Sequence, residues 1–122
     1  EHSDIISVHC ALTPDTENMF NLDVFKKMKP SSIFINTARG GIHNEKDLIK
    51  ALKNHSIWGA GLDVTNPEPM AFDNPLLRME NVAVTPHIGS ATIEARNEMS
   101  RLAAMNIIQF TRGEKISNLV VQ

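Results

Sequence analysis

Four residues that could bind an anion or move a proton stand close to the ends of short apolar runs: Arg39, Asp63, Glu68 and His87. An arginine binds a carboxylate through a two-pronged, charge-assisted contact. A histidine gives or takes a proton near neutral pH, and a glutamate beside it favours the protonated ring and fixes its orientation. Together they suit reduction of a 2-keto acid. Arginine would hold the carboxylate, histidine would protonate the forming alkoxide, and a nicotinamide would supply hydride.

Each of these residues also has an ordinary structural explanation. Arg39 by itself is more often a surface ion-pair residue, and Glu68 in a polar loop is usually solvated. His87 follows a proline, so it could cap the next helix or bind a backbone carbonyl, and Asp63 could brace its own loop. The chemical interpretation therefore depends on whether the fold brings the four side chains to one place.

The elements that must position these residues are four apolar runs of strand length, which alternate with helical patterns. The runs are Ile5–Cys10, Ser32–Asn36, Ile57–Val64 and Val82–Thr85. Leu22, Phe25 and Met28 recur at helical spacing, and Asn44 can cap a second helix that ends near Asn54. This alternation predicts an α/β domain with a parallel sheet covered on both sides. Because ligands bind beyond the carboxyl ends of such strands, we expect the four residues to converge at that edge.

The remaining segments predict loops and one long helix. Ala38–Gly41 is a turn, Asn66–Pro69 is a proline-bearing loop, and Asn74–Leu77 is a short helical turn. A helix is expected from about Ser90 to Thr111, closed by Gly113, with one apolar stripe that suits a core or an interface. Its stripe consists of Ala95, Met99, Leu102, Asn106 and Phe110. A short strand could follow at Leu119–Val121.

Composition limits the class of protein. The 122 residues are 42% hydrophobic and 21% charged with a formal net charge of −2, which is ordinary for a folded domain and argues against disorder. No run of basic residues indicates a nucleic acid or membrane partner, no apolar stretch is long enough to span a bilayer, and no metal site is expected. The single cysteine, Cys10, excludes an internal disulfide and suits a reducing compartment, so we expect the cytoplasm.

Three blocks of sequence, in order and at fitting spacing, resemble the D-2-hydroxyacid dehydrogenases. They are Asn36–Gly41 (NTARGG), Gly61–Pro69 (GLDVTNPEP) and Thr85–Thr92 (TPHIGSAT). Cys10–Pro14 is similar to an upstream loop of that family that faces the cofactor. The blocks around Asp63 and His87, and Arg112–Glu114, are most similar to the glyoxylate/hydroxypyruvate reductase branch. The resemblance implies a partial Rossmann-type, doubly wound sheet followed by a long C-terminal helix.

The resemblance also implies residue roles. Arg39 would bind the substrate carboxylate and keto oxygen, His87 would be the acid/base residue, and Glu68 would be its partner. Asp63 would face the nicotinamide of NAD or NADP. The same cofactor would also contact Arg39 and His87, together with Cys10, Pro14, Thr37, Ala38 and Gly89. The substrate would be a small 2-keto or 2-hydroxy acid, and the family implies a homodimer.

One departure from the family pattern is large. The Gly-x-Gly-x-x-Gly turn that grips the pyrophosphate does not occur in the 122 residues. We therefore expect residues 1–122 to be the C-terminal part of an NAD(P)-binding domain, with about 90–122 reaching back toward a substrate domain. This piece alone should be inactive. The alternatives are a nucleotide-sensing co-regulator module and a piece that acts only in dimerisation.

Overall fold

The computed structural model describes residues 1–116 and 118–119, which fall into two units, Glu1–His87 and Ile88–Gln122. All four residues with candidate chemistry, Arg39, Asp63, Glu68 and His87, belong to the first unit. The strand expected at Leu119–Val121 falls mostly on positions outside the described residues.

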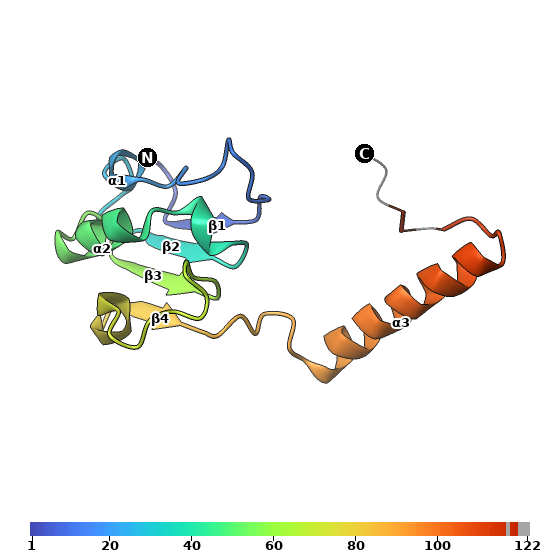
Figure 1. Cartoon of the computed structure of the whole chain (residues 1–122). Coiled ribbons are helices and arrows are strands. Elements are labelled where there is room, and N and C mark those ends of the chain that lie inside the picture. The colour runs from blue at the N-terminus through green and yellow to red at the C-terminus, as the bar shows by residue number, and fades with distance from the viewer. Residues whose placement is uncertain (117, 120–122) are drawn as a thin grey trace. The chain divides into compact units, whose positions relative to one another are not determined.

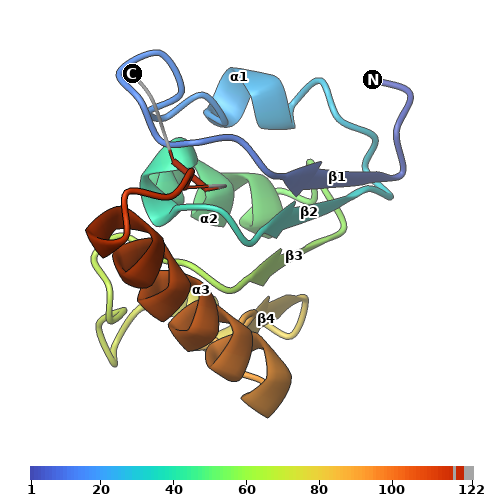
Figure 2. The ribbon, with the colours of Figure 1, turned by 90° about the vertical axis from the view of Figure 1, so that its right-hand side faces the viewer.

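The first unit is built on a four-stranded parallel sheet, as the alternating pattern predicts. The strands lie in the order β1-β2-β3-β4, and Figure 2 shows them side by side and pointing the same way. Their bounds are β1 Ile5–Val8, β2 Ile33–Asn36, β3 Gly59–Leu62 and β4 Val82–Val84. Helices and 3-10 turns connect them (Figure 1): α1 Leu22–Phe25, η1 Gly40–Ile42, α2 Glu45–Lys53 and η2 Pro75–Arg78. Three of the strands, β1, β3 and β4, stop before the apolar runs do, since the chain bends into the loops that carry the candidate site.

Local side chains set where the two helices of this unit begin. Asn44 caps α2, because its side-chain oxygen accepts a hydrogen bond from the backbone N–H of Asp47 at 3.1 Å. Asp47 in turn accepts from the N–H of Leu22 at 3.0 Å and so ties α2 to the start of α1. Regular α-helix in α1 ends at Phe25, and the chain continues in tighter turns to Met28, which remains buried.

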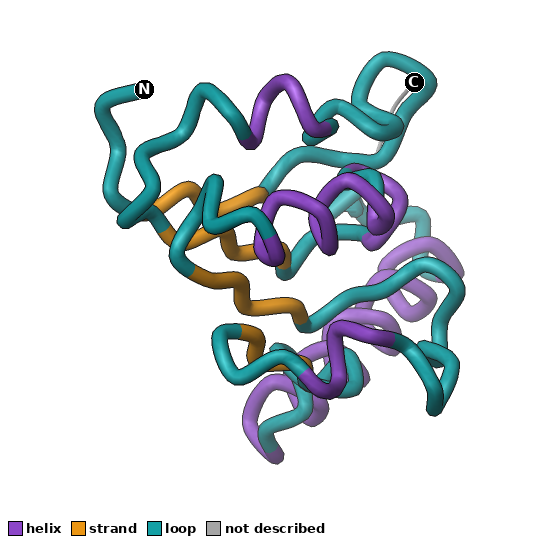
Figure 3. Tube along the Cα trace, turned by 90° about the vertical axis from the view of Figure 1, so that its left-hand side faces the viewer, coloured by secondary structure: helices purple, strands orange, loops and turns teal. Residues whose placement is uncertain are grey.

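The core of the first unit lies on one face of the sheet. Phe34 of β2 is fully buried against Phe25 of α1, with ring centroids 5.3 Å apart, and Leu48 and Leu52 of α2 pack into the same cluster. Figure 3 shows the helices of this unit beside the strands. The other face is less covered, with Ile5 62% exposed. The expected cover on both faces is therefore seen on one face within residues 1–87, because no helix of that segment crosses the second.

The second unit contains α3, Ile93–Thr111. It begins three residues later than expected because the hydroxyl of Thr92 accepts from the N–H of Ala95 at 3.1 Å and caps the helix. Gly113 follows the end of the helix with a φ of 66°, the left-handed geometry that favours glycine there. None of the side chains of α3 is buried within its unit, and Phe110 is 74% exposed. The helices of the described residues include none with the length and hydrophobicity of a membrane span.

Candidate active site

Glu68 and His87, which come from different loops, are joined by a short hydrogen bond. Nδ1 of His87 lies 2.6 Å from Oε1 of Glu68, and both side chains are about 40% exposed, at 43% and 40%. A carboxylate can only accept, so Nδ1 carries the hydrogen and donates it. The proton that can pass to a ligand is therefore the one on Nε2.

Backbone geometry aims the His87 ring at Glu68. The N–H of His87 donates to the carbonyl of Thr85 at 3.0 Å, so the chain closes a three-residue turn around Pro86. His87 has a φ of 55°, a left-handed conformation that is uncommon outside glycine and that concentrates at functional sites. The proline and the turn together explain how a residue at the end of β4 faces back toward the loop after β3.

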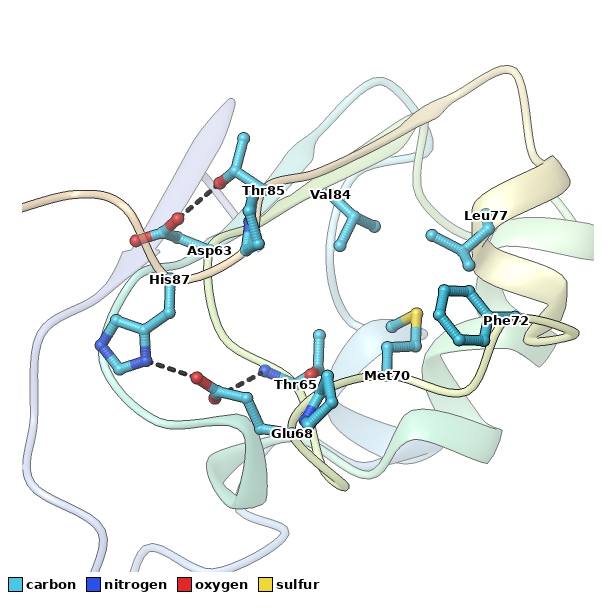
Figure 4. Close-up of a pocket in the computed structure, with 11 residues that line it drawn as sticks. Asp63, Thr65, Glu68, Met70, Phe72, Leu77, Val84, Thr85 and His87 are labelled. Carbon is cyan, nitrogen blue, oxygen red and sulfur yellow. Dashed lines mark hydrogen bonds and ion pairs between the residues drawn. The ribbon is translucent and has the colours of Figure 1, made fainter. Parts of the chain in front are cut away.

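Thr65 restrains the glutamate from its other side (Figure 4). Its buried N–H lies 3.5 Å from Oε2 of Glu68, and its hydroxyl donates to the carbonyl of Pro67 at 2.8 Å. One carboxylate oxygen thus faces His87 and the other faces the backbone of the same loop. The loop holds the carboxylate in the orientation that the imidazole needs.

A cavity of about 530 Å³ opens beside the pair, a size typical of small-molecule sites. Figure 4 shows polar and apolar side chains at different ends of it. At the polar end, Asp63 is 8% exposed and accepts from the hydroxyl of Thr85 at 2.5 Å. The apolar end consists of Met70, Phe72, Leu77 and Val84.

Arg39 lies in a different hollow. This hollow has a volume of about 600 Å³ and is formed by the loops after β1 and β2, with Arg39, His9, Cys10, Ala11, Leu12, Thr37 and Ala38 as its lining. The exposed guanidinium donates from Nη1 to the carbonyl of Ala38 at 2.7 Å. The structure therefore unites Glu68 with His87 and places Arg39 on the loop of an adjacent strand, outside the lining of the first cavity.

Gly40 brings the loop after β2, which carries Arg39, against the loop after β3, which carries Glu68. A Cβ on Gly40 would lie 2.1 Å from the carbonyl oxygen of Thr65, so only glycine allows this approach. The backbone of the Arg39 loop thus rests directly on the residue that restrains Glu68. This contact links the loop that carries the arginine to the loop that carries Glu68.

Some of the residues predicted to touch a cofactor line the hollow around Arg39, and others lie outside it. Cys10, Thr37 and Ala38 line the hollow with Arg39. Pro14 lies outside that lining, in an exposed turn that the hydroxyl of Thr16 holds by donating to the carbonyl of Ala11 at 2.7 Å. Gly89 belongs to the second unit.

Sequence reasoning missed Thr65 and Thr85 as partners of the site carboxylates. It also gave no role to His43, although this histidine contacts Asn36, which in turn donates to the carbonyl of Arg39. Both threonines stand two residues away from Asp63 or His87 in the sequence, and this nearness was the available signal that they contact the site.

Comparisons with known proteins find related sequences. The model of the D-isomer specific 2-hydroxyacid dehydrogenase NAD-binding domain matches residues 1–89. Human glyoxylate reductase/hydroxypyruvate reductase is 52% identical over 112 residues, covering 92% of this chain and 34% of that protein. The glyoxylate reductase of Korarchaeum cryptofilum is 46% identical over 122 residues, covering 100% of this chain and 37% of that protein.

Solved structures give the same result. The TT0316 protein of Thermus thermophilus superposes with a TM-score of 0.91 at 40% identity, over 98% of this chain and 38% of that one. A D-isomer specific 2-hydroxyacid dehydrogenase from Lactobacillus delbrueckii ssp. bulgaricus in its NAD-complexed form gives 0.88 at 32% identity, over 98% and 40%. The chain thus spans roughly a third of the length of the curated relatives it matches.

Proposed function

This chain belongs to the D-isomer specific 2-hydroxyacid dehydrogenases, through their NAD-binding domain, and on that premise we propose that it supplies the acid/base and substrate-binding residues for reducing a small 2-keto acid to a D-2-hydroxy acid. Glyoxylate and hydroxypyruvate are the proposed substrates, after the names of its relatives. The observation that carries the proposal is the 2.6 Å bond between Glu68 and His87 beyond the carboxyl ends of the parallel strands.

The residues present fit the nicotinamide half of NAD or NADP. The hollow beside Cys10, Thr37 and Ala38 lies at the sheet edge where dinucleotides bind in open parallel folds. Those three residues and Arg39 would hold this half, and Pro14, Asp63, His87 and Gly89 complete the proposed contacts. The glycine-rich pyrophosphate turn does not occur in these 122 residues. When bound, the nicotinamide supplies hydride chemistry.

The residues of this chain would divide the remaining work. The guanidinium of Arg39 binds the substrate carboxylate through two parallel hydrogen bonds. His87 donates the proton on Nε2 to the carbonyl oxygen as the carbonyl carbon is reduced. Glu68 stabilises the charged ring and accepts the hydrogen bond from Nδ1, so that Nε2 faces the substrate.

A chimaera tests the proposal. Residues 1–122 would replace the matching segment of the Korarchaeum cryptofilum glyoxylate reductase, which aligns with the whole chain. Oxidation of NADH and NADPH would be followed with glyoxylate and with hydroxypyruvate. We expect turnover that falls about 10²- to 10⁴-fold in His87→Ala and is unchanged in His2→Ala. A chimaera with the circular dichroism and oligomeric state of its parent but no turnover would refute the proposal, as would an unaffected His87→Ala.

The paired Glu68 and His87 favour an enzyme over a nucleotide-sensing module, because sensing needs no proton donor. We further propose that about 90–122 reach toward a substrate domain, since apolar side chains of α3 such as Ile93 and Phe110 are exposed within their own unit. A cytoplasmic homodimer completes the proposal. Light scattering of the chimaera tests the dimer.

A further inference from the structure

His43 is a buried histidine outside the proposed catalytic set. It directly follows η1, is 3% exposed, and packs against the ring of Phe34 with centroids 5.8 Å apart. Its Nδ1 lies 3.0 Å from Nδ2 of Asn36, which is itself fully buried at the end of β2. A buried polar pair of this kind keeps its geometry because leaving either partner unsatisfied is costly.

Asn36 also holds the loop backbone before and after Arg39, at the peptide group between Thr37 and Ala38 and at the one between Arg39 and Gly40. Its Oδ1 accepts from the N–H of Ala38 at 3.0 Å, and its Nδ2 donates to the carbonyl of Arg39 at 2.9 Å. The first contact requires an acceptor and the second requires a donor, so the amide has only one possible orientation. One side chain therefore holds peptide groups before and after Arg39.

The same logic assigns the state of His43. The second hydrogen of the Asn36 amide points at Nδ1, so Nδ1 must be an acceptor and the ring must be neutral, with its hydrogen on Nε2. Burial lowers the pKa of His43 to about 4, which agrees with a neutral ring near pH 7. Protonation of His43 would place a second donor opposite the Asn36 amide hydrogen. Removal of the ring would leave that hydrogen without an acceptor.

We propose that His43 and Asn36 are positioning residues for Arg39, and that they hold the loop backbone around it so that the guanidinium presents itself to a carboxylate. The inference rests on the proposed function for what Arg39 binds. It goes beyond that function because neither residue touches the substrate. His43 acts through the orientation of the Asn36 amide, and Asn36 acts through the backbone of the loop.

The first test needs no catalysis and uses the full 122-residue chain labelled with ¹⁵N. Nuclear magnetic resonance should show Nδ1 of His43 unprotonated and Nε2 protonated at pH 7. In Asn36→Asp the side chain can no longer donate, so the hydrogen should move to Nδ1. The backbone order parameter of Arg39 should fall in His43→Phe, which keeps a ring against Phe34, and not in the exposed control His2→Phe. An equally ordered Arg39 in both variants would overturn the inference.

The second test measures kinetics in the chimaera. For His43→Phe we expect the KM for glyoxylate to rise about five- to tenfold, equivalent to one net hydrogen bond, with kcat changed less than about threefold. Partial unfolding would lower the apparent kcat and leave KM unchanged, so the split separates positioning from simple damage. His43→Asn, whose Oδ1 can replace Nδ1 as the acceptor, should restore most of the KM.

The outcomes separate the two proposals. An active chimaera whose KM is the same in His43→Phe and His2→Phe would overturn the positioning role while the proposed function stood. An inactive chimaera together with the expected His43 tautomer and loss of Arg39 order would sink the proposed function and leave the positioning of the loop supported.

Discussion

His43 should make the fold sensitive to acid in a way that one substitution removes. The pKa of a histidine is about 6.5 in the unfolded chain, and burial lowers the pKa of folded His43 to about 4. The unfolded state therefore takes up the proton first as the pH falls. Stability from the neutral ring is fully present above about pH 6.5, declines between 6.5 and 4, and is lost below 4.

The loss of stability in acid follows from the pKa values of His43 in the unfolded and folded chain. Each pKa unit corresponds to about 1.4 kcal/mol, so the full difference of 6.5 − 4 = 2.5 units amounts to roughly 3 kcal/mol. Between pH 7 and pH 5 the loss is about 2 kcal/mol. With an m-value of about 2 kcal/mol/M for urea, the unfolding midpoint should shift by roughly 1 M.

Urea titrations at pH 7 and pH 5 would measure the free energy of unfolding of the 122-residue chain and of His43→Asn. The asparagine keeps a hydrogen-bond acceptor but does not titrate. Other groups also change with pH, but they are common to both proteins, so the double difference isolates His43. His2→Asn serves as the control, and it should lose as much stability as the parent. If the parent and His43→Asn lost the same free energy of unfolding between the two pH values, the neutral buried ring would be the wrong description.

Three further results are expected. In the chimaera, Glu68→Gln removes the carboxylate that accepts the hydrogen bond from Nδ1 of His87 and so orients the ring, and kcat should fall about tenfold or more; an unchanged kcat would contradict the pairing. Gly40→Ala drives a Cβ into the carbonyl of Thr65, so chemical unfolding should show a loss of about 1–3 kcal/mol and kcat/KM should fall with it; a variant as stable as the parent would show that the loops can separate freely. The 122-residue chain alone should not oxidise NADH with glyoxylate, and spectrophotometric turnover by it would disprove that.

The parts of the fold that follow local rules were predictable. The four strands follow from short apolar runs, and the start of α2 follows from Asn44, whose cap needs only neighbours in sequence. The shared edge of the sheet follows from parallel pairing, which brings the ends of β3 and β4 together wherever the loops lead. Glu68 and His87 could be placed near each other on that argument alone.

The parts that depend on tertiary register were not predictable. His43 precedes a helix in the sequence, but its burial comes from the pairing of its backbone with Phe20, 23 positions earlier, and from the ring of Phe34. The hollow around Arg39 is formed by the loops after two different strands, and Gly40 approaches Thr65 of a third loop; no local pattern reports either arrangement. A bond such as that between Thr85 and Asp63 is visible only once two strands are paired.

The contacts around the site form one continuous path. Asn36 holds the N–H of Ala38 and the carbonyl of Arg39, Gly40 touches the backbone of Thr65, and Thr65 faces the carboxylate that binds His87. In the proposed reaction, a keto acid must be held at its carboxylate and protonated at its carbonyl oxygen in the same event. The separation of the two groups on the enzyme must then match a fixed separation on the substrate. Rigid backbone contact through a glycine meets that requirement better than two independent loops, because neither loop can move without displacing the other.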